Sequence, residues 1–394
     1  MDMEKKSLLI NNGSASKKYA LYQGDIEVAF AHYEHENMVT LLTTRFRGMK
    51  ETIRLSRDEF ETALNHFFSL LILHKLVIGK TDISSIGIRI VAPGTFFVRH
   101  TRINPDYIQA LRDSVSRSPL HIVPVLKELD LISRTFPSVP VIGISDSAFH
   151  SSLPSVAYTY GLPKDVSAGL DVTRFGYHGI SIASLMDKIK KINHGNIPEK
   201  VIICHLGGGV SVTALKNGIS VDTSMGFTPL EGLVMATRVG DIDPGAILYL
   251  SSKLQKNPEE IADYLNTKCG LLGVSGVSSD VRDLLKSEVT GNTDAKLALD
   301  LFAYRVKKYL GSYMAVLGGV DMIVFSGTIG ERSFPMRERI LSGLLPLGII
   351  LDKDKNLTVD SVDSSIHSRE TRVQIAVLCT DEMGQMAKII QGTY

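Results

Sequence analysis

One arginine and two aspartates stand close together in an apolar, glycine-broken part of the chain, the stretch from Asp222 to Gly245. Arg238 is followed by Gly240, Asp241 and Asp243. The segment is too irregular for one helix and too apolar for a solvated loop. A guanidinium group in such a setting is typical of a charge placed in a cleft to bind an anion. A buried structural ion pair explains the same residues, so the rest of the sequence has to decide.

Further charged residues follow or interrupt apolar runs, where an unpaired charge would be costly. They are Arg89, Asp146, His178, His205 and Glu382. Each alone could be a paired core charge. With Arg238 and Asp241 they match phosphoryl transfer onto a carboxylate, because arginines bind anionic oxygens, carboxylates hold Mg²⁺ and imidazoles contact the transferring phosphoryl group.

Three glycine-containing turns suit phosphate groups: Asn11–Lys18, His205–Gly209 and Gly327–Gly330. Glycine lets backbone N–H groups converge on an anion, and serine hydroxyls and a lysine supply further donors in the first turn. The third turn opens a predicted helix. A tight turn would explain each one separately, but all three follow a predicted buried strand, which favours phosphate binding.

The predicted elements place these turns in a duplicated α/β protein. Residues 7–22 and 201–215 each give an apolar strand, a glycine turn and a second strand, about half a chain apart. Strands alternate with helices elsewhere, which indicates α/β layering. Further strands are predicted at 86–91, 139–144, 321–326 and 373–379, and helices at 57–77, 106–115, 122–134, 180–192, 258–268, 279–286, 293–317 and 381–390. Ser56 with Glu59 resembles a capping box for the helix expected over 57–77.

Composition limits the function classes. The chain has 394 residues, 44% apolar and 22% charged, with a formal net charge of +1, so we expect two or three domains and no nucleic-acid partner. The longest apolar runs are too short for a membrane helix or a signal peptide, so no membrane partner is expected. Three cysteines without a CxxC spacing predict reduced thiols and a cytoplasmic protein. Residues 32–36 (HYEHE) lack metal-ligand spacing, and we interpret them as a solvated hairpin.

Five motifs resemble those of the acetate kinases, the acetokinase branch of the actin-like ATPase superfamily. With the further match at Glu382, they are spread from residue 11 to residue 382, so the resemblance covers the whole chain. The matching segments are Asn11–Lys18, Ser145–His150, Phe175–Gly179, Asp222–Pro244 and Gly270–Asp280.

The resemblance implies two actin-like, ribonuclease H-like α/β domains with duplicated βββαβαβα cores and an active-site cleft between them. Residues 1–147 would form the first domain, completed by a C-terminal helix at 381–394, and residues 148–380 the second, with the nucleotide site. The implied reaction is reversible transfer of the γ-phosphoryl group of ATP to acetate, with Mg²⁺, for which Mn²⁺ can substitute. A short-chain carboxylate and a nucleotide would be the ligands, and the protein would be a homodimer.

The resemblance also implies residue roles. Arg89, Asp146, His178 and Arg238 would be catalytic, and Arg89, Val91, Leu120, Tyr177 and Pro229 would bind the acid. Asn11 and Glu382 would position the metal. The nucleotide and its phosphates would contact Ser14, Ser16, Lys18, His205, Gly207, Gly208, Gly209, Asp280, Arg282, Gly327, Thr328, Ile329 and Gly330.

The chain departs from the family pattern mainly on the nucleotide side. Gly208 replaces an asparagine, Thr328 a glycine, Arg332 an asparagine and Asp381 the asparagine before Glu382. Two alternatives to the acetate kinase reading follow. The enzyme could phosphorylate propionate or butyrate, or use a donor such as pyrophosphate; alternatively, the fold could serve as an inactive sensor or scaffold.

Overall fold

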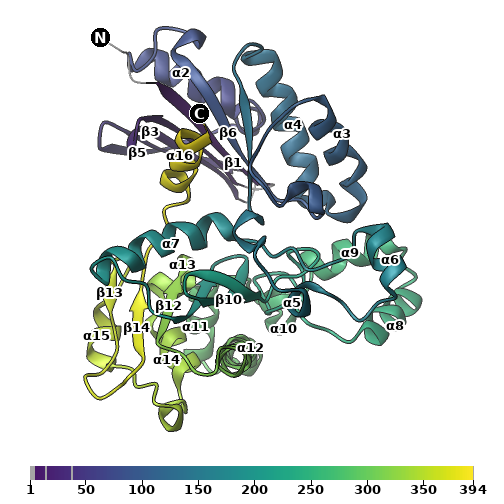
Figure 1. Ribbon diagram of the computed structural model, residues 1–394, viewed down its shortest axis with the longest axis vertical. Coiled ribbons are helices and arrows are strands. Elements are labelled where there is room, and N and C mark those ends of the chain that lie inside the picture. The colour runs from purple at the N-terminus through teal and green to yellow at the C-terminus, as the bar shows by residue number, and fades with distance from the viewer. Residues whose placement is uncertain (1–4, 14–15, 37–38, 394) are drawn as a thin grey trace. The chain divides into compact units, whose positions relative to one another are not determined.

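The computed structural model describes residues 5–13, 16–36 and 39–393, and it divides into two compact units (Figure 1). Unit 1 comprises residues 1–148 and 381–394, and unit 2 comprises residues 149–380. No helix within the described residues is both long and apolar enough to span a membrane.

Unit 1 is built on an eight-stranded sheet in the order β5-β4-β3-β2-β1-β6-β8-β7. The first five strands are antiparallel, and β6 and β8 continue the sheet in parallel with β1. The strands are β1 (Lys6–Asn12), β2 (Ser16–Gln23), β3 (Ile26–Glu36), β4 (Val39–Phe46), β5 (Met49–Leu55), β6 (Ile83–Ile90), β7 (Thr101–Arg102) and β8 (Val141–Ser145).

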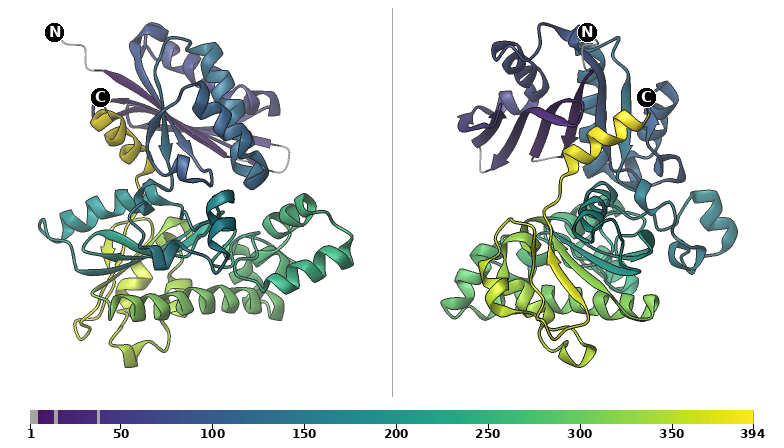
Figure 2. Two further views of the ribbon diagram at one scale, coloured as in Figure 1. Left: turned by 45° about the vertical axis from the view of Figure 1, so that its right-hand side comes forward. Right: turned by 60° about the vertical axis from the view of Figure 1, so that its left-hand side comes forward.

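Helices cover both faces of this sheet. Successive residues of a strand point to opposite sides, and apolar residues of β1 occur on both. Leu8 and Ile10 of β1 belong to the core that α2 and α4 complete. Leu9 lies on the other side, where Ile390 of the C-terminal helix α16 also meets the sheet at Gly87, and α16 packs on β1 and β6 (Figure 2). The helices of unit 1 are α1 (Arg57–Glu61), α2 (Ala63–Leu73), α3 (Pro105–Asp113), α4 (Pro119–Thr135) and α16 (Glu382–Thr393).

Unit 2 repeats this plan with a six-stranded sheet in the order β11-β10-β9-β12-β14-β13. An antiparallel β9-β10-β11 meander is again followed by parallel strands, β12 and β14. The strands are β9 (Lys200–Leu206), β10 (Val210–Lys216), β11 (Ile219–Thr223), β12 (Met322–Ser326), β13 (Ser364–Ser365) and β14 (Gln374–Val377). The duplicated α/β fold predicted from the sequence is confirmed.

The helices of unit 2 surround its sheet. Apolar residues of α7 pack on one face, and α12 packs along β9 and β10 (Figure 1). These helices are α5 (Ser155–Tyr158), α6 (Lys164–Leu170), α7 (Gly179–Ile192), α8 (Pro244–Leu254), α9 (Pro258–Thr267), α10 (Gly270–Ser275), α11 (Val281–Val289), α12 (Thr293–Leu317), α13 (Gly327–Arg332), α14 (Phe334–Leu341) and α15 (Lys353–Thr358).

Two local predictions are wrong. The helix predicted over 57–77 is broken at Thr62 and ends at Leu73, since Lys75 adopts a left-handed conformation with φ of 56°. Residues 32–36 are not a solvated hairpin but belong to β3, where Tyr33 is fully buried. The prediction failed because the polar residues of HYEHE alternate along a strand of which only one face is buried.

Candidate active-site residues

In unit 1, four predicted site residues form one hydrogen-bonded cluster. Arg89, near the end of β6, donates to both carboxylate oxygens of Asp146, from Nε to Oδ1 at 3.1 Å and from Nη2 to Oδ2 at 2.8 Å. Its Nη1 donates to Oδ1 of Asn11 at 3.4 Å and lies 4.0 Å from Oε2 of Glu382. The Asn11 amide also donates to Glu382 Oε2 at 2.9 Å. The carboxyl ends of β1, β6 and β8 thus bring together residues from four distant segments.

The environment of this cluster keeps Arg89 charged. Asp146 is fully buried, whereas the side chains of Arg89 and Glu382 are each nearly one-fifth exposed. Burial alone would lower the pKa of Arg89, but the Asp146 and Glu382 carboxylates outweigh it and raise that pKa above its ordinary value. With one cation and two anions, the three side chains carry a net charge of −1, which leaves the cluster suited to a further cation.

His32 of β3, which the sequence analysis placed in a solvated hairpin, lies beside the first glycine turn. Ser16 and Lys18 lie on β2, and the Ser16 hydroxyl pairs with Nε2 of His32 at 2.7 Å. Burial, followed by the charge of Lys18, lowers the pKa of His32 to about 4, so this imidazole is neutral at pH 7. Predicted phosphate ligand Ser14 lies outside the described residues.

In unit 2, His178 and Arg238 both face the second glycine turn. A Cβ atom built on Gly209 would lie 3.2 Å from Nε2 of His178 and 3.6 Å from Nη1 of Arg238. Nδ1 of His178 pairs with the Ser211 hydroxyl at 2.9 Å, and the His178 ring lies 4.5 Å from that of His205. The turn therefore exposes its backbone to an imidazole and a guanidinium group at once.

The two residues predicted to line an acyl pocket in unit 2 are both buried. The Tyr177 hydroxyl donates to the Phe227 carbonyl at 2.6 Å, and the Pro229 carbonyl accepts from Nη1 of Arg238 at 3.3 Å. In unit 1, Val91 is half-buried and Leu120 is exposed at the start of α4. Tyr177 is only 1% exposed, and its hydroxyl is already bonded.

The remaining charges of the Asp222–Gly245 stretch are structural. Asp241 accepts from the Gly232 N–H at 2.8 Å and the Tyr309 hydroxyl at 2.7 Å, and Asp243 caps α8. The sequence analysis missed Arg174, which pairs with Glu231 and donates to the carbonyls of Thr223, Ser224 and Met225. The structural interpretation therefore holds for the aspartates, whereas Arg238 faces the turn and its anion-binding role stays a prediction.

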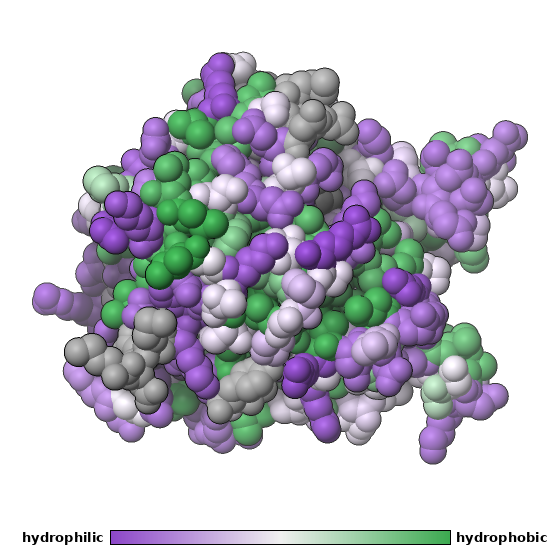
Figure 3. All heavy atoms as spheres, turned by 90° about the horizontal axis from the view of Figure 1, so that it is seen from above, coloured by the Kyte–Doolittle hydropathy of each residue, from purple (hydrophilic) through white to green (hydrophobic). Residues whose placement is uncertain are grey.

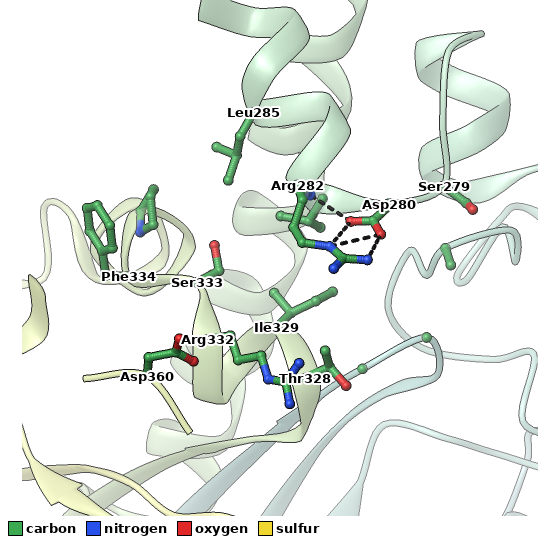
Figure 4. Close-up of a pocket in the computed structure, with 15 residues that line it drawn as sticks. Ser279, Asp280, Arg282, Leu285, Thr328, Ile329, Arg332, Ser333, Phe334 and Asp360 are labelled. Atoms are coloured by element: carbon green, nitrogen blue, oxygen red, sulfur yellow. Dashed lines mark hydrogen bonds and ion pairs between the residues drawn. The ribbon is translucent and has the colours of Figure 1, made fainter. Parts of the chain in front are cut away.

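A pocket of about 670 Å³ in unit 2 has the size of a nucleotide or drug-sized ligand site (Figure 4). Six predicted nucleotide-binding residues line it: Gly207, Gly208, Asp280, Arg282, Thr328 and Ile329. The other predicted residues of unit 2, His205, Gly209, Gly327 and Gly330, are not among its lining residues. Gly327, with φ of +73°, packs against the Leu206 backbone, where a side chain would clash.

The pocket also has walls that the motifs did not predict. Leu285, Phe334 and Pro335 add apolar surface, and Arg332 is held by the Ser361 hydroxyl at 2.8 Å. Arg282 pairs with both oxygens of Asp280, the residue that caps α11 (Figure 4). This mixture of apolar surface and few charged groups is typical of small-molecule sites.

Arg337 supports the pocket from behind. It is fully buried and donates to the carbonyls of Gly330, Glu331, Asn356 and Val359 and to the Asn356 amide oxygen. It therefore joins the end of α13, which carries three pocket residues, to α15 and the residue that follows it. No spacing rule identifies such a residue, because its partners are carbonyls brought close only by the fold.

The duplicated topology and the paired glycine turns are those of the actin-like kinases, and the fold class assigns the protein to that superfamily. Within it, the chain belongs to the acetokinase family, whose model matches residues 6–388. The resemblance inferred from the motifs is thereby confirmed. The protein is an enzyme, a phosphotransferase whose acceptor is a carboxyl group.

Relatives match over nearly the full chain. Acetate kinases of Desulfitobacterium hafniense and Clostridium novyi are 38% and 37% identical, over 96% and 97% of this chain and the same shares of their own. The crystal structure of Porphyromonas gingivalis acetate kinase matches with a TM-score of 0.86 at 32% identity, covering 98% of this chain and 99% of its own. A propionate kinase from Francisella tularensis matches with a TM-score of 0.88 at 31% identity, covering 98% of both chains.

Proposed function

We propose that this protein catalyses the reversible, Mg²⁺-dependent transfer of the γ-phosphoryl group of ATP to acetate, giving acetyl phosphate and ADP. One observation carries the proposal: the Gly207–Gly209 turn contributes to the wall of a nucleotide-sized pocket, and His178 and Arg238 face Gly209 in the same turn. His178 and Arg238, as hydrogen-bond donors to the transferring phosphoryl group, would therefore lie beside the pocket for the nucleotide. The names of the D. hafniense and C. novyi relatives support acetate as the acceptor.

The chemistry needs no general base, because a carboxylic acid is already ionised at neutral pH. A carboxylate oxygen bonds to the γ-phosphorus, and the bond from that phosphorus to the β,γ-bridging oxygen breaks, leaving the negative charge on ADP. The main requirement for catalysis is to stabilise the charge that the transition state spreads over the three equatorial oxygens of the phosphoryl group. Arg238 and His178 would stabilise that charge as preorganised donors.

Arg89 is proposed to bind the carboxylate of the acid. Its two-point pairing with Asp146 fixes the plane of the guanidinium group, and a planar guanidinium matches a carboxylate in geometry. Asp146 would then act by orienting Arg89 and, through it, the acetate. Ser16 and Lys18 in unit 1, and His205, Asp280, Arg282 and Thr328 in unit 2, would bind the donor.

The cluster in unit 1 fits a magnesium ion. Mg²⁺ is usually held by one or two carboxylates together with water and substrate phosphates. Asn11 and Glu382 offer an amide oxygen and a carboxylate, joined by a hydrogen bond of 2.9 Å, and the cluster has a net charge of −1. When bound, the ion would neutralise phosphate charge, and Mn²⁺ would substitute through the same oxygen ligands.

Propionate is the second candidate acceptor, favoured by the structural match to the F. tularensis propionate kinase. Val91, Leu120, Tyr177 and Pro229 would contact the alkyl group in either case. One methylene in an apolar pocket changes binding by only about 1–3 kcal/mol. We therefore expect acetate to be preferred, with measurable turnover of propionate and less of butyrate.

The decisive experiment measures acyl phosphate formation, trapped as the hydroxamate, for acids of two to four carbons with ATP, GTP and pyrophosphate. We expect ATP with acetate to give the highest kcat/KM. Dominance of pyrophosphate or of propionate would replace the substrates proposed here. Absence of turnover with every pair would overturn the enzymatic proposal and favour an inactive sensor or scaffold.

A homodimer is also proposed, on the evidence of the surface, and a cytoplasmic location on that of the three free cysteines. None of the residues of α8 is fully buried, and Leu248 and Tyr249 are 72% and 64% exposed. On the face in Figure 3, hydrophobic side chains gather in groups among hydrophilic ones. A second copy covering α8 would bury the exposed side chains of Leu248 and Tyr249. Light scattering should give a dimer that Leu248→Glu converts to monomer, and a monomeric wild type would refute it.

A further inference from the structure

His150 is a buried histidine beside the proposed site that the roles above do not use. It ends the short turn η4 (Ala148–His150), and only 3% of it is exposed. Its Nε2 pairs with the Tyr177 carbonyl at 2.9 Å, and its Nδ1 pairs with the Ser220 hydroxyl at 2.9 Å. The imidazole thus connects η4 and β11 to the residue directly before His178.

The two partners determine the proton positions on the ring. A carbonyl oxygen can only accept, so Nε2 of His150 must carry a proton and donate to Tyr177. In the neutral ring, Nδ1 then accepts from Ser220, which fixes one tautomer. Both bonds are satisfied without a charge in a buried environment.

The backbone that His150 holds is unusual. Gly176 and His178 both have left-handed conformations, with φ of 73° and 63°, on either side of Tyr177. A left-handed histidine is strained and persists only where its surroundings fix it. A Cβ atom at Gly176 would lie 2.8 Å from the His150 ring and 2.6 Å from Thr223, so the turn is packed directly against the imidazole. The Tyr177 hydroxyl is fixed separately by the Phe227 carbonyl at 2.6 Å.

We propose that His150 is a positioning residue, which holds the left-handed turn at 176–178 so that Nε2 of His178 faces Gly209. The proposal rests on the proposed role of His178 in phosphoryl transfer. It gives a reason for the hydrogen bond between the His150 side chain and the Tyr177 carbonyl, which lies between two left-handed residues. A displacement of the reacting groups by about 1 Å can cost about 10²-fold in rate.

The test compares His150→Ala, His150→Gln and Ser220→Ala. The glutamine amide can still donate to the Tyr177 carbonyl, whereas alanine cannot, and Ser220→Ala removes only the partner of Nδ1. We expect His150→Ala to lower kcat by about 10- to 100-fold with KM for ATP and acetate changed less than about threefold. Glutamine should restore most of the loss, and Ser220→Ala should have a smaller effect. His66→Ala, which loses a histidine paired with Tyr33 outside both sites, should retain wild-type kcat.

Amide hydrogen exchange over residues 175–182 provides a readout that does not need activity. Faster exchange there in His150→Ala, slowed again in His150→Gln, supports the proposal even if wild type phosphorylates none of the acids, in which case the proposed function alone fails. Wild-type kcat and wild-type exchange in His150→Ala would overturn it. Equal loss of kcat and of thermal stability in both His150 variants would also overturn it, since that result indicates only a core residue.

Discussion

A methyl group added at Gly209 should disable the proposed phosphoryl site selectively. Gly209 has no positive φ, so alanine can adopt its backbone conformation. The added Cβ would lie 3.2 Å from Nε2 and 3.4 Å from Cε1 of His178, and 3.6 Å from Nη1 of Arg238. It would therefore stand between the two groups that are proposed to contact the equatorial oxygens.

The size of the effect follows from this geometry. A phosphoryl oxygen must approach Nε2 to about 2.8 Å to accept a charge-assisted hydrogen bond, and a carbon atom 3.2 Å from that nitrogen occupies the approach. Losing one preorganised donor to transition-state charge costs about 10²–10³ in kcat. We expect Gly209→Ala to lose that factor, while KM for ATP changes less than about threefold because the pocket wall is untouched.

Steady-state kinetics with two control variants tests this reasoning. A Cβ atom at Gly208 meets no atom within 4 Å, so Gly208→Ala should change KM for ATP rather than kcat. Gly311→Ala, on the exposed side of α12, should leave both unchanged. The reasoning is refuted if Gly209→Ala keeps a kcat within about threefold of wild type, or if the two turn variants lose kcat equally.

Three further predictions concern neighbouring groups. Ser211→Ala removes a hydroxyl partner of His178 and should lower kcat by about 3- to 10-fold; an unchanged kcat would contradict this. Glu382→Gln leaves the unit 1 cluster without its net negative charge, so half-maximal rate should require at least about tenfold more Mg²⁺ in a titration at fixed ATP, and an unaltered titration would exclude Glu382 from the metal site. The pKa of His32 is about 4 in the folded protein and about 6.5 when unfolded. The unfolded state therefore binds more protons between these values, and the free energy of unfolding should fall by about 2–3 kcal/mol from pH 6.5 to pH 4. Urea unfolding should show this fall, reduced in His32→Gln; an equal fall in that variant would assign the pH dependence to other groups.

The elements best predicted from sequence are those with local signals at both ends. Helix α12 begins and ends where predicted, because Asn292 caps its first turn and Gly318 takes the left-handed conformation at its end. The helix predicted at 57–77 carried only a start signal, Ser56 with Glu59, and its interior break at Thr62 has no sequence marker. Strand β3 was missed over 32–36 because its exposed face is as polar as a loop.

The candidate site residues also differ in whether a local sequence pattern indicates them. Candidate residues at or near the carboxyl ends of buried strands, such as Arg89, Asp146 and His205, can be predicted from pattern because parallel strands end at one edge of the sheet. Arg174, His150 and Arg337 could not be found so, because each bonds to backbone carbonyls from distant segments. Whether a buried arginine is catalytic or structural depends on these tertiary partners, which no spacing encodes.

The departures from the family pattern differ in their structural consequences. Asp381 accepts from the Gly384 N–H at 2.9 Å and so caps α16, which keeps Glu382 in the first turn of that helix. Gly208 and Thr328 line the pocket, and space is open at Gly208, so replacing an asparagine there removes a donor without moving the turn. Neither lies between His178 and Arg238. These substitutions thus alter the wall of the pocket that is proposed to bind the donor, and they leave the groups facing Gly209 unchanged. We therefore expect them to change the affinity for the donor more than the rate of the transfer step.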